Sequence, residues 1–171
     1  MKFIVFILII CLTLVACNPF APALDNSKDE GSNLLSDQKT PDGVCQNLKY
    51  AYTFRDTTVY GHLIDGNFTF IYPDYDNNNG ADVTWGRYIE MQSAYALFQY
   101  AQRLDLIWNR ITDSSFNADR TVATISRGFN LTVTLNPNQI IYVDGYADLT
   151  LGRQRPQDPW MITSWYDDSN H

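Results

Sequence analysis

The stretch FNLTVTLNPNQIIYVDGYADLTL, residues 129–151, decides the fold class of this chain. In its first seven residues apolar and polar side chains alternate strictly, which is the pattern of a half-buried strand. Asn136-Pro137-Asn138 then supplies a turn. The alternation resumes at residues 140–151. The stretch therefore predicts an antiparallel hairpin with one buried face and one solvated face.

Period-two alternation continues on both sides of this hairpin. Residues 104–108 also place apolar side chains at every second position, and residues 160–167 are expected to form the last strand. Residues 120–128 extend the first strand of the hairpin backwards, and Gly128 stands where a bulge or bend would let a long strand curve. The second half of the chain is therefore predicted to form four antiparallel strands.

Helical spacing dominates the region before these strands. Two short helices are predicted from Asp42 and from Asp56, each residue serving as an N-cap. A short strand at 68–72 and a loop at 73–82 follow. A third and longest helix is predicted at 85–102, with one apolar stripe formed by Trp85, Tyr88, Met91, Tyr95 and Phe98. Helices first and strands afterwards define an α+β fold class.

The chain opens with one basic residue and a short apolar run. The run from Phe3 to Ala16 is shorter than the roughly 20 residues needed to span a membrane, and its layout is that of a secretory signal. Leu14-Val15-Ala16-Cys17 resembles the lipobox of bacterial lipoproteins. That resemblance implies that residues 1–16 are removed and that acyl chains on Cys17 anchor the protein in a membrane.

The segment after the lipobox is predicted to be a flexible tether. Residues 17–41 are rich in Pro, Asn, Ser and Asp and lack apolar periodicity, so the folded domain is expected at 42–171. Asn18 follows the cysteine, where an aspartate would commonly retain a lipoprotein in the inner membrane. The resemblance therefore implies a protein of the cell envelope, on the outer membrane facing the periplasm if the host is Gram-negative.

The net charge limits which classes of binding partner can be expected, and the cysteine content limits which disulfides can form. The chain has 19 acidic and 12 basic residues, with a net charge of −7, so a nucleic-acid partner is not expected. The acyl anchor is the expected membrane attachment. With Cys11 in the signal and Cys17 lipidated, Cys45 has no cysteine partner and is expected to be a buried apolar residue.

The order of the elements and the end of the chain carry a second resemblance. Trp85-Gly86-Arg87 opens the long helix after a loop. The ending WMITSWYD, residues 160–167, is similar to a W-x-I-x-x-W-x-D ending. Together these features resemble the nuclear transport factor 2-like superfamily. The resemblance implies three N-terminal helices packed in a curved, mostly antiparallel sheet that forms a cone around a pocket.

This fold does not fix a function, because the superfamily contains isomerases, cyclases, hydrolases and dehydratases beside members that only bind or dimerise. The first hypothesis is a non-catalytic module that binds a small apolar ligand or a partner, with a homodimer through the sheet face. The alternative is a small isomerase-, cyclase- or hydrolase-type enzyme that uses an Asp or His in the cone.

Candidate site residues follow from both hypotheses. The residues expected to line a pocket are Tyr60, Asp65, Trp85, Tyr88, Tyr95 and Trp165. An acid–base mechanism would draw on the same Tyr60 and Asp65, or on His62, Tyr142, Tyr146, Asp148 and Asp167. None of these matches the family's catalytic positions, so no catalytic residue is assigned and no cofactor is expected.

The loop from Asp74 to Asp82 could hold calcium, because oxygen-bearing side chains recur at alternate positions. Its glycine is displaced from the EF-hand position, however, and Trp85 stands where a bidentate glutamate belongs. Asn and Gly are also ordinary turn residues. No metal site is therefore assigned.

Overall fold

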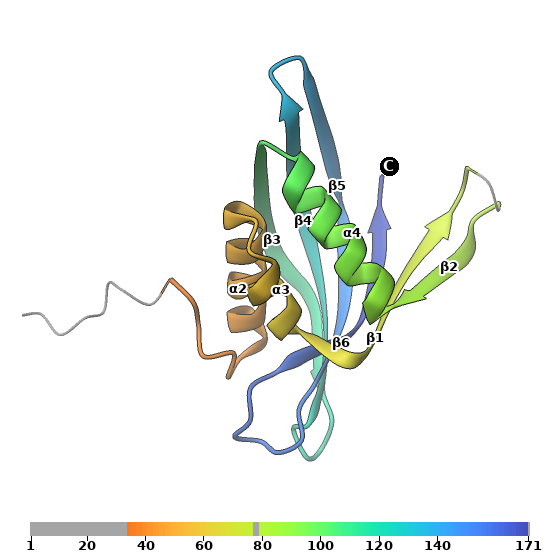
Figure 1. Cartoon of the computed structure of the whole chain (residues 1–171). Coiled ribbons are helices and arrows are strands. Elements are labelled where there is room, and N and C mark those ends of the chain that lie inside the picture. The colour runs from red at the N-terminus through yellow and green to blue at the C-terminus, as the bar shows by residue number, and fades with distance from the viewer. Residues whose placement is uncertain (1–33, 77–78, 171) are drawn as a thin grey trace, which may run out of the picture. The chain divides into compact units, whose positions relative to one another are not determined.

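A computed structural model describes residues 34–76 and 79–170, so the predicted signal peptide, Cys17 and most of the predicted tether lie outside the described residues. This part of the chain forms three helices and six strands, whose arrangement can be followed in Figure 1. Their bounds are α2 (Pro41–Phe54), α3 (Thr57–Leu63), β1 (Ile64–Asp74), β2 (Ala81–Gly86), α4 (Arg87–Tyr100), β3 (Arg103–Phe116), β4 (Val122–Asn136), β5 (Gln139–Gly152) and β6 (Met161–Ser169).

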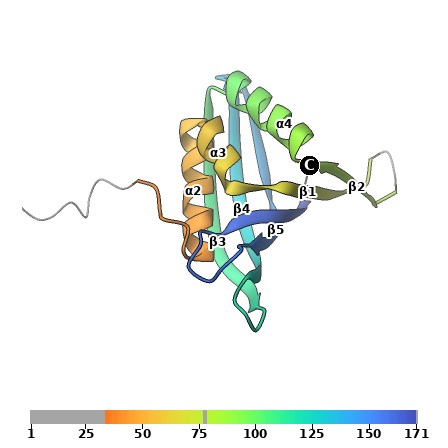
Figure 2. The ribbon, with the colours of Figure 1, turned by 60° about the horizontal axis from the view of Figure 1, so that its bottom comes forward.

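The six strands form one mixed sheet in the order β2-β1-β6-β5-β4-β3. β1 and β6 pair in parallel, and all the other pairs are antiparallel. The helices lie on one side of the sheet in Figure 1 and again in Figure 2. The predicted α+β class and mostly antiparallel sheet are confirmed. The helices precede the sheet only in part, because the β1–β2 hairpin separates α3 from α4 along the chain.

The second strand was not predicted. Residues 81–86 were expected to end a loop and begin a helix, but they form β2, and Trp85 pairs with Phe70 of β1. Their side chains do alternate, since Val83 and Trp85 are half-buried while Asp82 and Thr84 are exposed. The long helix therefore begins at Arg87, after the extended Gly86.

The domain also begins earlier than predicted. The N-cap of α2 is Thr40 rather than Asp42, and its hydroxyl accepts a hydrogen bond from the Gly43 amide at 3.0 Å. Upstream, the Ser36 amide donates to Oδ1 of the buried Asn47 at 2.6 Å. The second predicted N-cap, Asp56, is confirmed, because its carboxylate accepts from the first turn of α3. Ordered contacts thus begin by Ser36, inside the predicted tether.

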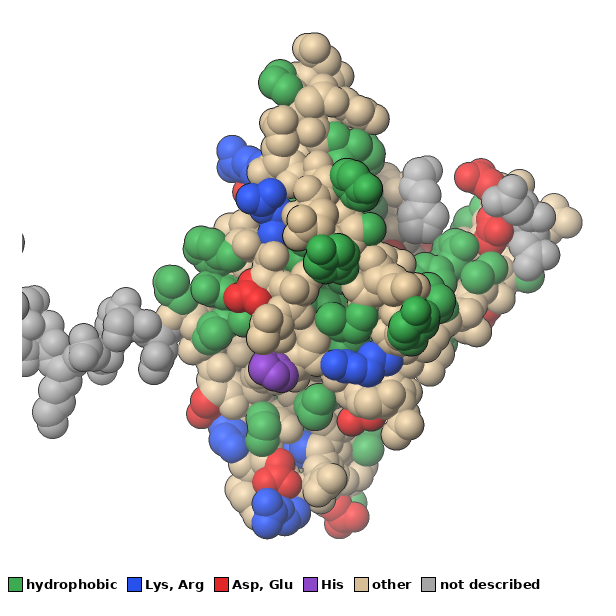
Figure 3. All heavy atoms as spheres, viewed as in Figure 1, with side chains coloured by type: hydrophobic (Ala, Val, Ile, Leu, Met, Phe, Trp, Pro, Cys, Tyr) green, Lys and Arg blue, Asp and Glu red, His purple; other side chains and the backbone are tan. Residues whose placement is uncertain are grey.

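The buried face of α4 differs from the predicted stripe. Tyr88 and Tyr95 are 73% and 57% exposed. Figure 3 shows hydrophobic side chains along the outer side of this helix. The helix instead buries Glu90, Ala94 and Phe98, spaced four residues apart, which is also helical spacing. Tyrosine tolerates exposure because its ring carries a polar end, so apolar spacing alone selected the wrong face.

The predicted irregularity at Gly128 lies on the neighbouring strand. The pairing of β3 with β4 shifts between Trp108 and Ile111, which leaves an extra β3 residue opposite Gly128. A Cβ atom at Gly128 would contact the Asn109 side chain at 3.4 Å. A bulge of this kind increases the local twist of the paired strands, which helps the sheet curve toward the helices.

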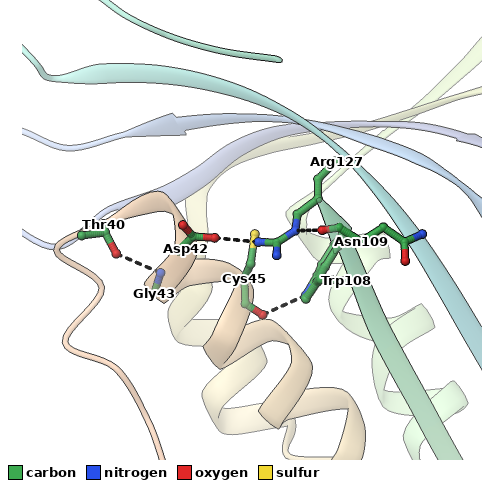
Figure 4. Close-up of polar contacts among 7 residues, drawn as sticks. All are labelled: Thr40, Asp42, Gly43, Cys45, Trp108, Asn109 and Arg127. Carbon is green, nitrogen blue, oxygen red and sulfur yellow. Dashed lines mark hydrogen bonds and ion pairs between the residues drawn. The ribbon is translucent and has the colours of Figure 1, made fainter. Parts of the chain in front are cut away.

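Polar contacts join α2 to β3 and β4 at the edge of the hydrophobic core (Figure 4). Arg127 of β4 pairs with Asp42 at 2.7 Å and donates from Nε to the Asn109 carbonyl, also at 2.7 Å. The Trp108 indole donates to the Cys45 carbonyl at 2.9 Å. Cys45 is 1% exposed, which confirms it as a core residue, and burial raises the pKa of its thiol to about 11.

Candidate functional site

A cavity of about 290 Å³ lies between α4 and the sheet. Most of its lining side chains are apolar and come from α4 and all six strands: Phe70, Trp85, Ala94, Leu97, Leu106, Phe129, Leu131, Val143 and Trp165. Four polar side chains complete the wall: Tyr52, Glu90, Ser93 and Asp167. Ser93 is exposed and marks the rim. An apolar cavity with a few polar groups is the usual form of a small-molecule site.

Strand register builds the aromatic wall of this cavity. Phe70 lies opposite Trp85 on one neighbouring strand and beside Trp165 on the other. The Phe70 and Trp85 rings stack with centroids 4.6 Å apart, and the Phe70 and Trp165 centroids are 5.7 Å apart. Three adjacent strands therefore present one continuous row of rings, which is the kind of cross-strand contact that stabilises a sheet.

Glu90 is the most deeply buried acid of the site. It lies on the sheet-facing side of α4 and is 6% exposed. Oε1 accepts a hydrogen bond from the Tyr60 hydroxyl, and Oε2 accepts one from the Trp85 indole at 2.7 Å. Burial above all, with the neighbouring Tyr52 and Glu90, raises the pKa of Tyr60 well above its ordinary value. Tyr60 therefore stays a donor to the carboxylate at any physiological pH.

Asp167 brings a second carboxylate to the cavity. It follows Trp165 by two residues on β6, so both side chains point to the same face of the sheet. Tyr52 stands close to both acids. Burial first, then the charges of Glu90 and Asp167, raise the pKa of Tyr52. The cavity thus combines two carboxylates with a phenol that remains protonated.

The described side chains of the cavity wall are apolar, neutral polar or acidic. Among the described residues that line the cavity, none is Lys, Arg or His. Arg87 lies one turn before Glu90 on α4, but its guanidinium donates to the backbone carbonyls of Gly61, at 2.9 Å, and of Ile64. Within the described part of the chain, the buried Trp165 indole N–H has no hydrogen-bond acceptor.

The structure places the predicted pocket residues in different surroundings. Trp85 and Trp165 line the cavity, and Tyr60 lies behind it, bound to Glu90. Tyr88 and Tyr95 are exposed on the outer side of α4 and do not line it. Asp65 accepts from the Asn67 amide at 2.8 Å and lies in a separate surface depression beside Arg153.

Of the other candidates for acid–base chemistry, one lines the cavity and the rest are exposed outside it. Asp167 lines the cavity, whereas His62, Tyr142, Tyr146 and Asp148 are exposed and outside it. In the proposed calcium loop, Asp74 and Asp82 lie in the paired ends of the β1–β2 hairpin, and Asn78 lies outside the described residues. No cluster of three or more potential metal ligands occurs among residues 34–76 and 79–170.

Sequence reasoning missed Tyr52, Ser93 and above all Glu90. A single glutamate in a helix normally indicates a solvated position. The available signal was its spacing from Ala94 and Phe98, which places the three residues on one helix face. The donors that make its burial tolerable, Tyr60 and Trp85, could only be identified from the tertiary structure.

The chain has a pocketed α+β fold with a curved mixed sheet. Solved structures resemble it, although no protein-family model and no curated protein matches the chain. A conserved protein from Planctomyces limnophilus superposes with a TM-score of 0.64 at 12% identity, over 75% of this chain and 92% of that protein.

Two further structures carry a descriptive name, and one of these names a fold family. A proposed dehydratase of the nuclear transport factor 2-like family from Streptomyces avermitilis has a TM-score of 0.59 at 12% identity, over 76% of this chain and 94% of its own. A proposed scytalone dehydratase from Novosphingobium aromaticivorans has a TM-score of 0.60 at 11% identity, over 76% and 81%. The domain of this chain therefore has the nuclear transport factor 2-like fold.

Proposed function

We propose that this domain binds a small, largely apolar molecule in the cavity beneath α4, and that it does so without chemical conversion. The cavity itself carries the proposal, because its wall of aromatic and aliphatic side chains is interrupted only by Tyr52, Glu90, Ser93 and Asp167. The unpartnered indole N–H of Trp165 supports it as well. A buried donor without an acceptor is costly, and a bound molecule or water can supply one.

Blocking the rim tests this binding. Ser93→Trp adds a large ring at the exposed edge of the cavity, whereas Gln99→Trp adds the same ring on α4 away from the lining. The full chain is titrated with benzyl alcohol while the indole N–H resonances are followed by NMR. Saturable shifts in the wild type and in Gln99→Trp, but not in Ser93→Trp, are expected. Equal binding by both variants would place the molecule elsewhere.

A second candidate function is acid–base catalysis, favoured by the presence of two carboxylates and a phenol in one cavity. Asp167 lines the cavity, and its charge acts on the nearby Tyr52, so Asp167 is the candidate for a general base. The test follows hydrogen–deuterium exchange next to the carbonyl of cyclohexanone in D₂O. Exchange accelerated by the wild type and lost in Asp167→Asn would favour an enzyme over a binding module.

The proposal also includes display of the domain from a membrane through acyl chains on Cys17. The support is the sequence Leu14-Val15-Ala16-Cys17, which lies outside the described residues. No helix in the described ranges is long and apolar enough to cross a membrane. Labelling of expressing cells with an alkyne fatty acid tests the anchor: Cys17→Ser should lose the label, and Cys11→Ser should keep it.

A homodimer through the sheet stays a prediction. The surface in question is the outer face of β4 and β5, where Tyr142 and Tyr146 are 71% and 50% exposed. This face is separate from the ligand cavity, so binding of a molecule and pairing of two copies would not compete.

A further inference from the structure

We infer that Trp165 anchors the ligand of the cavity beneath α4, by donating a hydrogen bond from its indole N–H to an uncharged acceptor on an otherwise apolar molecule. The inference rests on the proposed function, because it names the group that a ligand of the same cavity must carry. Three features of the wall lead to it: where the Trp165 ring is held, what its N–H lacks, and how Glu90 is bonded.

The ring of Trp165 belongs to the wall of the cavity and is held there by its neighbours in the sheet. Trp165 lies between Phe70 of β1 and Leu149 of β5. It is 6% exposed and lines the cavity, and its ring centroid lies 5.7 Å from that of Phe70. The two flanking strands therefore fix the ring beside any molecule that fills the cavity.

The N–H of this ring differs from those of two other tryptophans. Trp85 donates to Oε2 of Glu90 at 2.7 Å, and Trp108 donates to the Cys45 carbonyl at 2.9 Å. Among the described residues, no acceptor meets the buried Nε1 of Trp165. A buried donor without a partner destabilises the folded state, so native structures keep few of them. An acceptor on a bound molecule would provide the missing bond.

Glu90 does not take this bond, although it lines the same cavity. Its Oε1 accepts from Tyr60 and its Oε2 accepts from Trp85. The Glu90 carboxylate also limits the charge of the ligand, because a second negative charge in a mostly apolar cavity would be repelled. The acceptor is therefore an uncharged oxygen or nitrogen, such as a carbonyl oxygen, rather than a carboxylate.

The rest of the wall defines the body of the ligand. Leu97, Leu106, Leu131 and Val143 offer no hydrogen bond, so the part of the molecule that contacts them is apolar. The volume of about 290 Å³ lies at the lower end of ordinary ligand cavities. The class of ligand is therefore a small apolar compound that carries an uncharged acceptor at the end nearest Trp165.

Two probes that differ only in the acceptor test this inference on the full chain at pH 7. They are acetophenone and α-methylstyrene, in which a CH₂ group replaces the carbonyl oxygen. NMR follows the indole N–H resonances, and Trp165→Phe identifies the Trp165 signal by removing it. Acetophenone should move this signal downfield as the hydrogen bond forms, and α-methylstyrene should not.

The outcomes of this titration separate the two proposals. If both probes bind with the same effect on the Trp165 signal, Trp165 is not the anchor, whereas ligand binding stands. If neither probe binds up to its solubility limit, the proposed function fails and the inference fails with it.

Benzoate tests the charge of the acceptor. It is close to acetophenone in size but is an anion at pH 7, so it should bind at least about tenfold more weakly. Benzoate binding as tight as that of acetophenone would show that the ligand is not restricted to uncharged acceptors.

Matched variants separate the hydrogen bond from the loss of a large ring. Trp165→Phe keeps an aromatic ring without an N–H, so it should shift the ratio of the acetophenone and α-methylstyrene dissociation constants roughly tenfold in favour of α-methylstyrene. Trp108→Phe, the same change outside the cavity lining, should leave this ratio unaltered. An unchanged ratio in Trp165→Phe, or an equal change in Trp108→Phe, would overturn the assignment. If Trp165→Phe fails to fold, the wild-type Trp165 signal, assigned by triple-resonance experiments, still decides.

Discussion

Two helices cover the same side of the sheet, and they meet it in different ways. In the packed half, where α2 lies against β3, the fully buried side chains include Val44, Cys45 and Leu48. In the hollow half, where α4 lies against β1 and β2, the helix presents a glutamate and leaves the cavity open beneath it.

This difference separates the packed core of the domain from the cavity in which we propose that a ligand binds. The packed half resembles an ordinary protein interior, with few voids and satisfied polar groups. The hollow half gives up packing contacts and buries acids, both of which lower stability. Departures from good packing of this kind are expected at functional sites, where stability is exchanged for binding.

The largest expected effect compares the same substitution in the two halves. Leu48→Ala removes a fully buried side chain of the packed half, and Leu106→Ala removes one that lines the cavity at 3% exposure. Both should lower the free energy of unfolding within about 2–5 kcal/mol, with Leu48→Ala in the upper part of that range. Leu106 loses less because part of its surroundings is already empty. Urea unfolding measures both losses, and equal losses would remove the distinction.

Alkaline pH offers a second test, in the packed half. The thiol of Cys45 has its pKa raised from 9.0 to about 11 in the folded state. Between pH 9 and about pH 11, the Cys45 thiol loses its proton in the unfolded chain but keeps it in the folded chain. The stabilisation is therefore fully present below pH 9 and is lost as the pH rises to 11, a change of about 2–3 kcal/mol. The difference in unfolding free energy between wild type and Cys45→Ala should shrink over this range. A constant difference would contradict the prediction.

A smaller effect is expected behind the cavity. Tyr60→Phe removes the hydroxyl that donates to Glu90, and it should lower the free energy of unfolding by about 1.5 kcal/mol. Tyr95→Phe is the control, since Tyr95 is exposed on α4 and its change should stay within about 0.5 kcal/mol. Thermal unfolding of the two variants compares them directly. Similar shifts in both would mean that Glu90 is not anchored by Tyr60.

The smallest expected effect concerns the edge of the packed half. Asp42 is largely exposed and pairs with the more buried Arg127. Asp42→Asn should therefore lower the free energy of unfolding by less than about 1 kcal/mol, and 1 M NaCl should reduce that difference through screening. Chemical unfolding at low and high salt provides the measurement. A loss of several kcal/mol, unaffected by salt, would show that this contact is part of the core.

The sequence predicted the sheet far better than the site. Alternation along residues 129–151 correctly indicated β4, β5 and the turn between them, because a strand with one buried face leaves a period of two. No comparable pattern in the sequence indicates that β6 pairs in parallel with β1. β1 and β6 are far apart in the chain, and nothing in either segment specifies which strand the other will join.

The face of α4 could not be predicted for a related reason. Apolar spacing treats tyrosine as buried and glutamate as exposed, and here the reverse holds for Tyr88, Tyr95 and Glu90. Glu90 can be buried because Tyr60, thirty positions away in the sequence, lies beside it.

The position of β6 in the sheet has a consequence for how the domain folds. The last strand of the chain lies between β1 and β5, so it alone joins the β1–β2 hairpin to the β3–β5 meander. β6 must therefore be in place before the two parts of the sheet can form one continuous wall of the cavity.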